Sequence, residues 1–279
     1  MGNSWLLLDC NSISYVAYYA ISKELTFENI RTDVIYGFMS LSLQLINEFS
    51  DHIPLFCWDH GFGKRKTLYP GYKAKRDLLP PEELKKREEF KDQIELIKFK
   101  YLPEMKVTNN FYADGYEADD IIASLVKNLK PKDSAIIVSG DQDLYQLLRD
   151  KVHIFCPRYR TLTTKGKFLA KYGIPVSQWA FYKALAGCTS DCIPGCPGIG
   201  SKKAIQFIKD ELPNPAKIEH FLQTDTYKLF KKLTTVPLEG CPEFSPVIEN
   251  ISTRDWRKLA SRLGMQTLRR KLNGQGRTV

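Results

Sequence analysis

The sequence lacks a long hydrophobic run, and its histidines are few. No stretch approaches the roughly 20 apolar residues that cross a bilayer, so we expect no membrane protein. The first apolar stretch ends at Asp9 without a basic segment before it, and Leu6 stands where myristoylation requires Ser or Thr. We therefore expect neither a signal peptide nor a lipid anchor, and a cytoplasmic or nucleoid-associated protein that is not secreted. The four histidines are dispersed and are assigned no role.

The sequence also lacks internal repeats and low-complexity segments, and its cysteines do not suggest a disulfide-bonded fold. Seven cysteines are an odd number, which argues against a disulfide framework. With 43% hydrophobic and 26% charged residues, the composition is that of a globular chain, so wholesale disorder is excluded. A length of 279 residues is enough for one large domain or two smaller ones.

Positive charge exceeds negative charge, and the excess is uneven. The net charge is +9, and the segment from Gly187 to the end holds 15 Lys and Arg against 9 Asp and Glu. The first 186 residues hold 26 against 23. A basic C-terminal third favours a module that binds a polyanion. A basic surface that only keeps the protein soluble is the alternative, and charge alone does not choose between them.

The N-terminal half alternates between short apolar runs and amphipathic segments. We predict strands at 5–9, 53–58, 106–112, 135–138 and 152–156, and helices at 11–20, 31–49, 117–129 and 142–149. This alternation predicts an α/β fold with a mostly parallel sheet and helices on both faces. Residues 64–104 interrupt it with a charged insertion, in which Pro80-Pro81 followed by two glutamates should begin a helix. From about residue 176 onward the chain is predicted to be helical.

Acidic residues stand where the apolar runs stop. Because the carboxyl ends of parallel strands meet at one edge, these carboxylates should converge there. Carboxylates packed together repel one another unless a cation binds them, and hard oxygen ligands select Mg²⁺ or Mn²⁺. The sequence therefore indicates a divalent-metal enzyme. The candidate ligands are Asp9, Asp59, Glu117, Asp119, Asp120, Asp141, Asp143 and Asp191.

Two acidic motifs carry most of this prediction. Glu117-Ala-Asp-Asp120 begins a helix, where acidic side chains also complement the helix dipole. The mutual repulsion of three acids in four positions nevertheless exceeds the stabilisation that the dipole gives. Ser139-Gly-Asp-Gln-Asp143 places two carboxylates on one side of a turn, although an ordinary Asx turn has the same form. Asp9-Cys-Asn11 is similar to the start of an aspartyl-phosphatase motif, but the second Asp of that motif is missing.

A glycine-rich turn precedes a basic helix near the middle of the C-terminal region. Ile193-Pro-Gly-Cys-Pro-Gly-Ile-Gly200 is followed by Lys202 and Lys203. Small residues let backbone N–H groups approach a phosphate at a helix N-terminus. The segment is not a Walker loop, because the Gly-Lys-Ser/Thr ending is absent. A plain turn between helices is the alternative to phosphate contact.

Together, these motifs resemble the 5′-nuclease family, which contains flap endonucleases and 5′→3′ exonucleases of phage and bacterial type. The resemblance covers nearly the whole chain, and the order and spacing of the motifs make it specific. It implies a PIN-like nuclease domain at 1–175 with a helical arch at about 64–104. A helical DNA-binding region follows at 176–279, with a helix–three-turn–helix at about 184–210.

The resemblance also assigns roles to individual residues. One ion would be held by Asp9, Asp59, Glu117, Asp119 and Asp141, and a second by Asp143 and Asp191 with shared use of Asp141 and of Asp119 or Asp120. In the arch, Tyr72 would stack on a base, Lys73 would be catalytic and Arg76 would contact phosphate, as the chemistry of these side chains allows. The residues implied to grip duplex DNA are Gly195, Gly198, Gly200, Lys202 and Lys203, with a K⁺ site in the backbone near Gly198, Ile199 and Gly200.

One segment departs from the family pattern. Family members usually read Gly-Asp-x-Ser-Asp-Asn-Ile-Pro-Gly, whereas this chain has Cys188 for the first Asp and Cys192 for the Asn, and keeps Asp191. The second metal site thus loses a hard ligand, so we expect it to hold its ion weakly. Cys188, Cys192 and Cys196 are spaced four apart, which also allows a zinc or iron–sulfur site. The intervening prolines and glycine break helical register and favour ordinary buried thiols instead.

The expected function is that of a metal-dependent 5′→3′ exonuclease and structure-specific flap endonuclease. Its partner would be DNA with a 5′ flap, fork, nick or free 5′ end, cleaved to leave 5′-phosphates, with no membrane and no small-molecule substrate. We expect a monomer. The alternatives are a ribonuclease that acts on RNA primers in RNA/DNA hybrids, and a structure-selective DNA-binding protein with an impaired second metal site.

Overall fold

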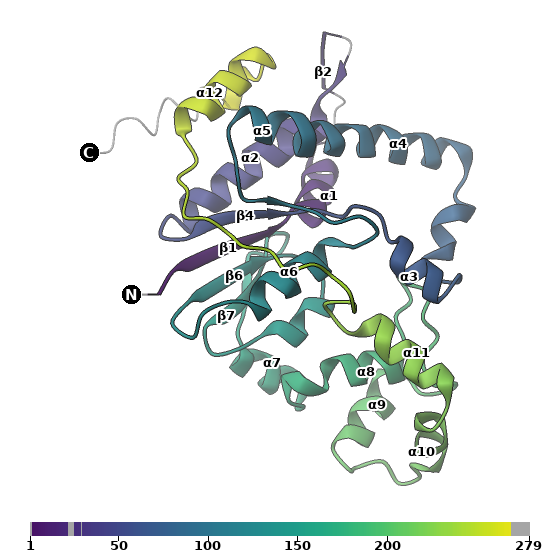
Figure 1. The fold of residues 1–279 in the computed structure, drawn as a ribbon. Coiled ribbons are helices and arrows are strands. Elements are labelled where there is room, and N and C mark those ends of the chain that lie inside the picture. The colour runs from purple at the N-terminus through teal and green to yellow at the C-terminus, as the bar shows by residue number, and fades with distance from the viewer. Residues whose placement is uncertain (1, 22–24, 29, 269–279) are drawn as a thin grey trace.

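A six-stranded sheet lies at the centre of the protein. The computed structural model describes residues 2–21, 25–28 and 30–268 (Figure 1). The strand order is β5-β4-β1-β6-β7-β8, and every pairing is parallel except that of β7 with β8. The strands are β1 (Ser4–Asp9), β4 (Ile53–Cys57), β5 (Asn110–Phe111), β6 (Ser134–Val138), β7 (Val152–Cys156) and β8 (Thr161–Thr163). The predicted mostly parallel α/β sheet is confirmed.

The central strands are continuously apolar because helices cover both of their faces. Leu6, Leu7 and Leu8 of β1 are all fully buried. Leu7 packs into a core with α6 (Ala118–Lys127) and α8 (Trp179–Ala186), whereas Leu6 and Leu8 pack into a second core. That second core contains residues of α1 (Cys10–Ala20), α2 (Asp33–Glu48) and α4 (Pro81–Leu96).

The register of the strands aligns their carboxyl ends. Asp9 of β1 pairs with Cys57 of β4, and Leu8 pairs with Val138 of β6. Residues that follow β4 and β6 therefore lie beside Asp9 at one edge of the sheet. This register places Asp59 and the turn that begins at Ser139 at the edge where a parallel α/β fold carries its site.

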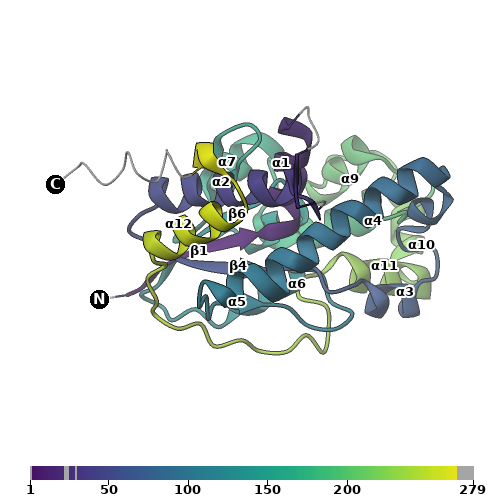
Figure 2. The same cartoon turned by 90° about the horizontal axis from the view of Figure 1, so that it is seen from above.

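The insertion begins near that edge and then forms helices that cover one face of the sheet. It comprises α3 (Gly63–Leu68), a 3-10 turn (Ala74–Leu78), α4, a π-helical turn (Ile97–Tyr101) and α5 (Leu102–Glu104). The sequence signal for the start of α4 is confirmed, because Pro80 is its N-cap and Pro81 its first residue. Figure 2 shows α4 and α5 as one long rod that crosses the molecule.

The C-terminal region, which follows β8 in the chain, is helical, as predicted. It contains α7 (Lys165–Tyr172), a 3-10 turn (Val176–Gln178), α8, α9 (Ser201–Ile208), α10 (Ala216–Leu222) and α11 (Asp225–Thr234). An irregular segment then leads to α12 (Thr253–Arg262), which packs Trp256 into the core that contains α1 and α2. Arg262 of α12 also forms an ion pair with Glu104 of α5. Helix α12 thus lies on the part of the molecule that holds the sheet (Figure 1).

Four local predictions differ from the structure. The helix predicted at 142–149 is a 3-10 turn at Asp143–Leu147, and the strand predicted at 106–112 is only Asn110–Phe111. Strand β8 and the hairpin of β2 (Thr26–Phe27) with β3 (Ile30–Arg31) were not predicted. These elements are too short to show a periodic apolar pattern. None of the helices within the described ranges is long and apolar enough to span a bilayer.

Candidate active site

The acidic edge of the sheet is organised by hydrogen bonds between its strands. Asp9 accepts a hydrogen bond from the Ser139 hydroxyl, which follows β6, at 2.6 Å. It also caps α1 by accepting from the Ser12 N–H at 2.9 Å. Asp59 accepts from the Ala118 N–H at 2.7 Å and so lies at the N-terminus of α6. Carboxylates from β1, β4, β6 and α6 therefore converge at one edge, as the strand-end argument predicted.

Burial and mutual repulsion perturb these carboxylates. Burial, with the charge of Asp59, raises the pKa of Asp9 to about 7. Asp141 is exposed to solvent, yet desolvation by the protein atoms around it, with the charge of Asp143, raises its pKa to about 6. The pKa of Asp59 is also raised, by burial and then by Glu117. Because the fully ionised edge is unfavourable without a counterion, this donor set fits a divalent cation.

Asp119 belongs to the same acidic edge. Its pKa is raised well above the ordinary value, first by burial and then by the charges of Asp120, Glu117 and Asp141. Asp120, in contrast, points into the protein and is fully buried. Its Oδ1 accepts from Arg65 at 2.8 Å and from the Leu238 N–H at 2.7 Å. These contacts occupy Asp120 in the core, so its placement argues against the predicted ligand role.

Arg65 joins this part of α6 to the C-terminal region. Its guanidinium is 2% exposed, pairs with Asp120 and Glu117, and donates to the Leu233 carbonyl at 3.2 Å. No local pattern could show this role, because Glu117, Asp120 and Leu233 lie 52, 55 and 168 residues from Arg65 along the chain.

The Arg65 contacts lead to a prediction about stability. Arg65→Met should lower the free energy of unfolding by about 3–5 kcal/mol, because the Asp120 carboxylate would remain buried without its partner. Urea unfolding monitored by circular dichroism measures this. Lys66→Met on the same helix is the matched control, since Lys66 forms an exposed pair with Asp77. A loss below about 1 kcal/mol, the range of surface pairs, would contradict the structural role.

Lys73 points into the acidic edge from the insertion. Its backbone adopts a left-handed conformation with φ of +54°, and its N–H donates to the Asp191 carbonyl at 3.0 Å. The ammonium forms an ion pair with Glu117 and lies 3.6 Å from Asp191 Oδ1. Burial lowers the pKa of Lys73, but Glu117 and Asp191 outweigh it and raise the pKa overall. The structure thus brings this predicted residue to the carboxylates.

Tyr72 is not where the base-stacking prediction requires it. The side chain is 3% exposed, and its hydroxyl donates to Glu117 Oε2 at 2.6 Å. In this structure the buried ring presents no free face to a nucleotide base, which argues against the stacking role that the resemblance implies. The apolar ring instead packs into the core that contains Leu7, and the hydroxyl orients Glu117.

Arg76 borders an open cleft of about 560 Å³ between the acidic edge and the long helix α4. Asp59 lies at this cleft, and α4 contributes both Arg87 and Lys91 and the acidic Glu88 and Glu95 to its wall. Tyr15 of α1 also lines it, is 40% exposed, and stacks on Phe90 with a centroid distance of 4.4 Å. Tyr15 therefore offers the exposed aromatic face that Tyr72 lacks. In the sequence, the only sign of this role for Tyr15 is that an aromatic residue lies on the polar side of an N-terminal helix.

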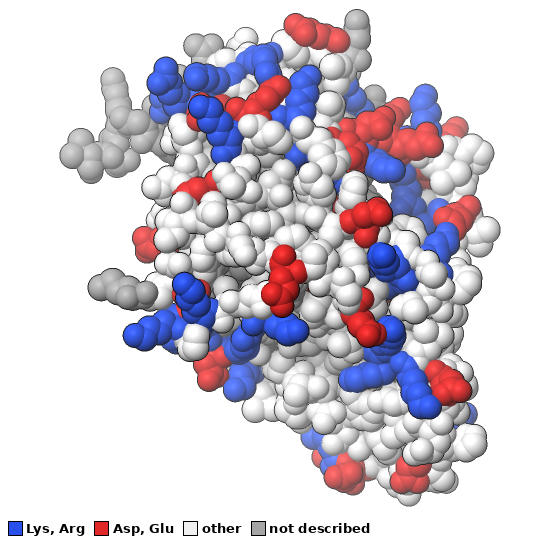
Figure 3. Space-filling view, viewed as in Figure 1, with Lys and Arg blue, Asp and Glu red and all other residues white. Residues whose placement is uncertain are grey.

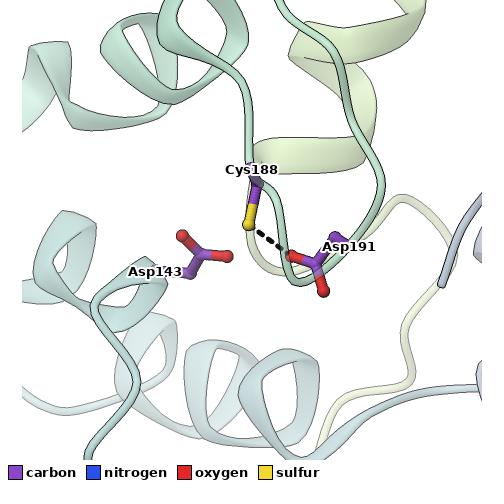
Figure 4. Close-up of side chains that lie close together, drawn as sticks. All are labelled: Asp143, Cys188 and Asp191. Atoms are coloured by element: carbon purple, nitrogen blue, oxygen red, sulfur yellow. Dashed lines mark hydrogen bonds between the residues drawn. The ribbon is translucent and has the colours of Figure 1, made fainter. Parts of the chain in front are cut away.

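A second group of candidate ligands lies beside the first. Asp143, Cys188 and Asp191 each offer a ligand atom, and these atoms all lie within 4.8 Å of one another (Figure 4). Cys188 Sγ lies 3.0 Å from Asp191 Oδ2. Burial and Asp191 raise the pKa of the Cys188 thiol to about 11. The group that the structure describes includes neither Cys192 nor Cys196, so it does not support a three-thiol zinc or iron–sulfur site.

Lys183 completes this group and was not singled out from the sequence. Its ammonium lies 2.7 Å from Asp143 Oδ1 and 3.8 Å from Cys188 Sγ. The signal that could have found it is that Lys183 is the single charged residue of α8, whose other residues are apolar or aromatic. A charge held on such a helix needs a partner, and here the partner is the metal-ligand group itself.

The glycine-rich turn has the conformation that its composition predicts. Gly195 and Gly198 have φ of +72° and +74°. A Cβ atom on Gly195 would lie 2.5 Å from the Leu185 carbonyl oxygen, whereas one on Gly200 would meet nothing within 4 Å. Gly200 is the N-cap of α9, and Lys202 and Lys203 are exposed in its first turn. Lys and Arg also gather over α3 and α11 on the face shown in Figure 3.

Comparisons with known proteins agree with this geometry. Residues 4–173 match the model of the 5′-3′ exonuclease, N-terminal resolvase-like domain. The chain is 34% identical over 206 residues to the thermostable DNA polymerase I of Thermus aquaticus, covering 74% of this chain and 24% of that protein. It is 30% identical over 276 residues to DNA polymerase I of Caldicellulosiruptor bescii, covering 91% of this chain and 31% of that protein. The chain thus spans less than a third of the length of these relatives.

A solved structure supports the fold. The flap endonuclease of bacteriophage T5, in a pseudo-enzyme–product complex with DNA and metal ions, superposes with a TM-score of 0.65. The match covers 98% of each chain at 21% sequence identity. The predicted PIN-like architecture is therefore confirmed.

Proposed function

Because this chain belongs to the 5′-3′ exonuclease family, we propose that it is a divalent-metal-dependent 5′ nuclease. Its substrate is DNA with a 5′ flap, fork, nick or free 5′ end, and hydrolysis near the branch or end leaves a 5′-phosphate. The observation that carries the proposal is the convergence of carboxylates from three parallel strands beside the Lys73 ammonium: Asp9 is buried, Asp59 is half-buried and Asp141 is exposed to solvent. The metal-bound complexes of relatives provide supporting analogy.

The residues that would hold divalent ions fall into two groups. Asp9, Asp59, Glu117, Asp119 and Asp141 would hold the first ion, and Asp143 and Asp191 would hold the second with shared use of Asp141 and Asp119. Mg²⁺ or Mn²⁺ suits the first group because all of its donors are oxygen atoms. Bound ions would supply an activated water and neutralise charge at the leaving oxygen.

Lys73 and Arg76 would act on the scissile phosphate. The Lys73 ammonium is held at the carboxylates by Glu117 and Asp191, so it is placed where negative charge develops during phosphoryl transfer. Arg76 borders the cleft that begins at Asp59 and would contact a neighbouring phosphate. The displaced 5′ strand would enter this cleft, where Tyr15 offers a stacking face.

The glycine-rich turn and α9 would bind the uncleaved duplex. The exposed backbone at Gly198 and Gly200 allows close approach of a phosphate, and Lys202 and Lys203 neutralise it, whereas Gly195 is buried against Leu185 and shapes the turn. The carbonyl groups near Gly198, Ile199 and Gly200 would form the K⁺ site. In this arrangement residues 1–175 cut, the helical region at 176–279 positions the duplex through the glycine-rich turn and α9, and one monomer suffices.

Salt dependence tests the duplex contacts. Affinity for forked DNA should fall steeply with salt, because neutralised phosphates release counterions. Replacing both Lys202 and Lys203 by Ala should flatten the slope of log affinity against log salt by roughly two units, about 0.9 for each contact. Fluorescence anisotropy over a salt series measures the slope. The control replaces Lys165 and Lys167, two exposed lysines of α7, by Ala. An unchanged slope in the α9 variant would remove Lys202 and Lys203 from the interface.

Matched substrates test the proposed function against its alternatives. A DNA flap, the same flap with a blocked 5′ end, and an RNA/DNA hybrid of the same sequence are digested in parallel. We expect DNA cleavage near the branch, with products that carry a 5′-phosphate. Cleavage of the hybrid alone would favour the ribonuclease, and tight binding without cleavage in Mg²⁺ or Mn²⁺ would favour the structure-selective binding protein.

A further inference from the structure

We propose that Asp143, Cys188 and Asp191 form a mixed thiolate–carboxylate site that binds a thiophilic divalent cation, of the Zn²⁺ class, in preference to Mg²⁺. The inference rests on the proposed function, because it identifies the occupant of the second metal position. It goes beyond that function because it assigns a metal-ligand role to the Cys188 sulfur of this chain.

The Cys188 sulfur lies close enough to the carboxylates of Asp143 and Asp191 to bind the same ion. Cys188 Sγ lies 3.0 Å from Asp191 Oδ2, and one atom of each of the three side chains falls within the 4.8 Å spread of a single coordination sphere. Figure 4 shows the three side chains converging from two different segments, the turn after β6 and the loop after α8. Cys188 belongs to the same core as Cys196, but its sulfur also has three polar neighbours: Asp191 Oδ2 at 3.0 Å, the Ser190 hydroxyl at 3.0 Å and the Lys183 ammonium at 3.8 Å.

The position of Cys188 is fixed by the loop around it. The Cys188 N–H donates to the Ile193 carbonyl at 2.8 Å, and the Ile193 N–H donates back to Cys188 at 3.0 Å. Gly187, with φ of +81°, leaves no room for a side chain, since a Cβ atom there would lie 2.6 Å from the Ile193 oxygen. The loop thus aims the thiol at Asp191 without a rearrangement on binding.

A second observation shows that this group attracts a cation. Asp143 Oδ1 is buried, and the Lys183 ammonium lies 2.7 Å from it as an ion pair. The same ammonium lies 3.8 Å from Cys188 Sγ. A single positive charge therefore already faces both segments of the group, and a divalent ion would replace it with more charge.

The donor set decides which ion is preferred. Thiolate is a soft ligand that suits Zn²⁺, whereas Mg²⁺ demands oxygen ligands and near-ideal octahedral geometry. Two carboxylates with one thiolate are three protein ligands, the number that catalytic zinc sites use. Binding would form one metal–sulfur bond and release the thiol proton to solvent, so no oxidant or reductant is required.

Cadmium titration tests the proposal without reference to cleavage. Reduced, metal-free protein is titrated with Cd²⁺ in the absence of DNA, and the ultraviolet sulfur-to-cadmium charge-transfer absorption is recorded. We expect a band that saturates at one ion per chain and that Zn²⁺ displaces, whereas an equal excess of Mg²⁺ does not. Cys188→Ser should abolish the band. Cys192→Ser, a partly exposed thiol in the same loop, is the matched control and should retain it.

Two further variants make the result specific. Asp143→Asn should weaken Cd²⁺ binding by at least about 10- to 100-fold, since groups that only hydrogen-bond to a metal ligand are already worth this much. Cys188→Asp should lose the band and should shift the Mg²⁺ dependence of cleavage to lower concentration, while narrowing the gap between Mg²⁺ and Mn²⁺.

The outcomes separate this inference from the proposed function. A band that survives in Cys188→Ser, no band in the wild-type protein, or equal displacement by Mg²⁺ would overturn the thiolate site. If Mg²⁺-dependent flap cleavage were intact in the same preparation, the proposed function would stand. A Cys188-dependent band in a protein that cuts no DNA would support the site and reject the nuclease.

Discussion

Asp141→Asn and Asp9→Asn are each expected to reduce flap cleavage to below about 1% of wild type, a loss of at least 2.7 kcal/mol at ~1.4 kcal/mol per tenfold. Both carboxylates lie at the acidic edge, and both have raised pKa values because burial and neighbouring charges act against ionisation. Asn is nearly isosteric with Asp but carries no charge, so it removes attraction for a divalent ion.

Binding to forked DNA should survive both substitutions, because the basic residues of α9 and the glycine-rich turn are unchanged. Single-turnover cleavage and anisotropy measured in Ca²⁺ separate the two effects. Asp150→Asn, at a carboxylate that forms only an exposed pair with Lys165, is the matched control and should cut normally. Cleavage above about 1% of wild type in both variants would contradict the metal assignment, since loss of such a ligand should cost several kcal/mol of transition-state stabilisation.

Lys73→Ala is expected to lower turnover by about 10²-fold or more, the usual effect of removing one donor to a developing negative charge. Affinity for the substrate should change far less. The reason is position: the ammonium is 11% exposed, is paired with Glu117, and lies 3.6 Å from Asp191. It therefore faces the reacting phosphate and has little surface with which to steer a strand.

Single-turnover rates at saturating enzyme separate chemistry from binding in this variant. Lys66→Ala is the control, because Lys66 belongs to the same insertion but is exposed and paired with Asp77. Since Lys73 has a left-handed backbone, Lys73→Asn, whose side chain tolerates that conformation, guards against a folding defect. A large loss of affinity with an unchanged single-turnover rate would reassign Lys73 to steering.

The parts of the site that depend on strand ends could be predicted from the sequence. Asp9, Asp59 and Asp141 each follow an apolar run, and parallel pairing alone brings such residues together. The same argument predicted the sheet and the covering helices. The glycine-rich turn was predictable because Gly195 and Gly198 need positive φ.

The parts that depend on distant partners could not be predicted. Asp120 belongs to an acidic motif by sequence, but its partners are Arg65 and the Leu238 N–H, 55 and 118 residues away. The same is true of Tyr72, because its burial depends on a core assembled from both halves of the chain. The pairing of Lys183 with Asp143 joins α8 to the turn after β6, which no local pattern shows.

The central claim is that the acidic edge is a metal-dependent site for cutting DNA near a 5′ end or branch. A 5′-labelled flap substrate, incubated with the protein in Mg²⁺ and in excess chelator, tests it most directly. The account predicts a labelled product released from the branch region in Mg²⁺ and intact substrate in chelator, with cleavage restored when Mg²⁺ is added back. Equal cleavage in chelator, or an intact flap in both Mg²⁺ and Mn²⁺ despite tight binding, would contradict it.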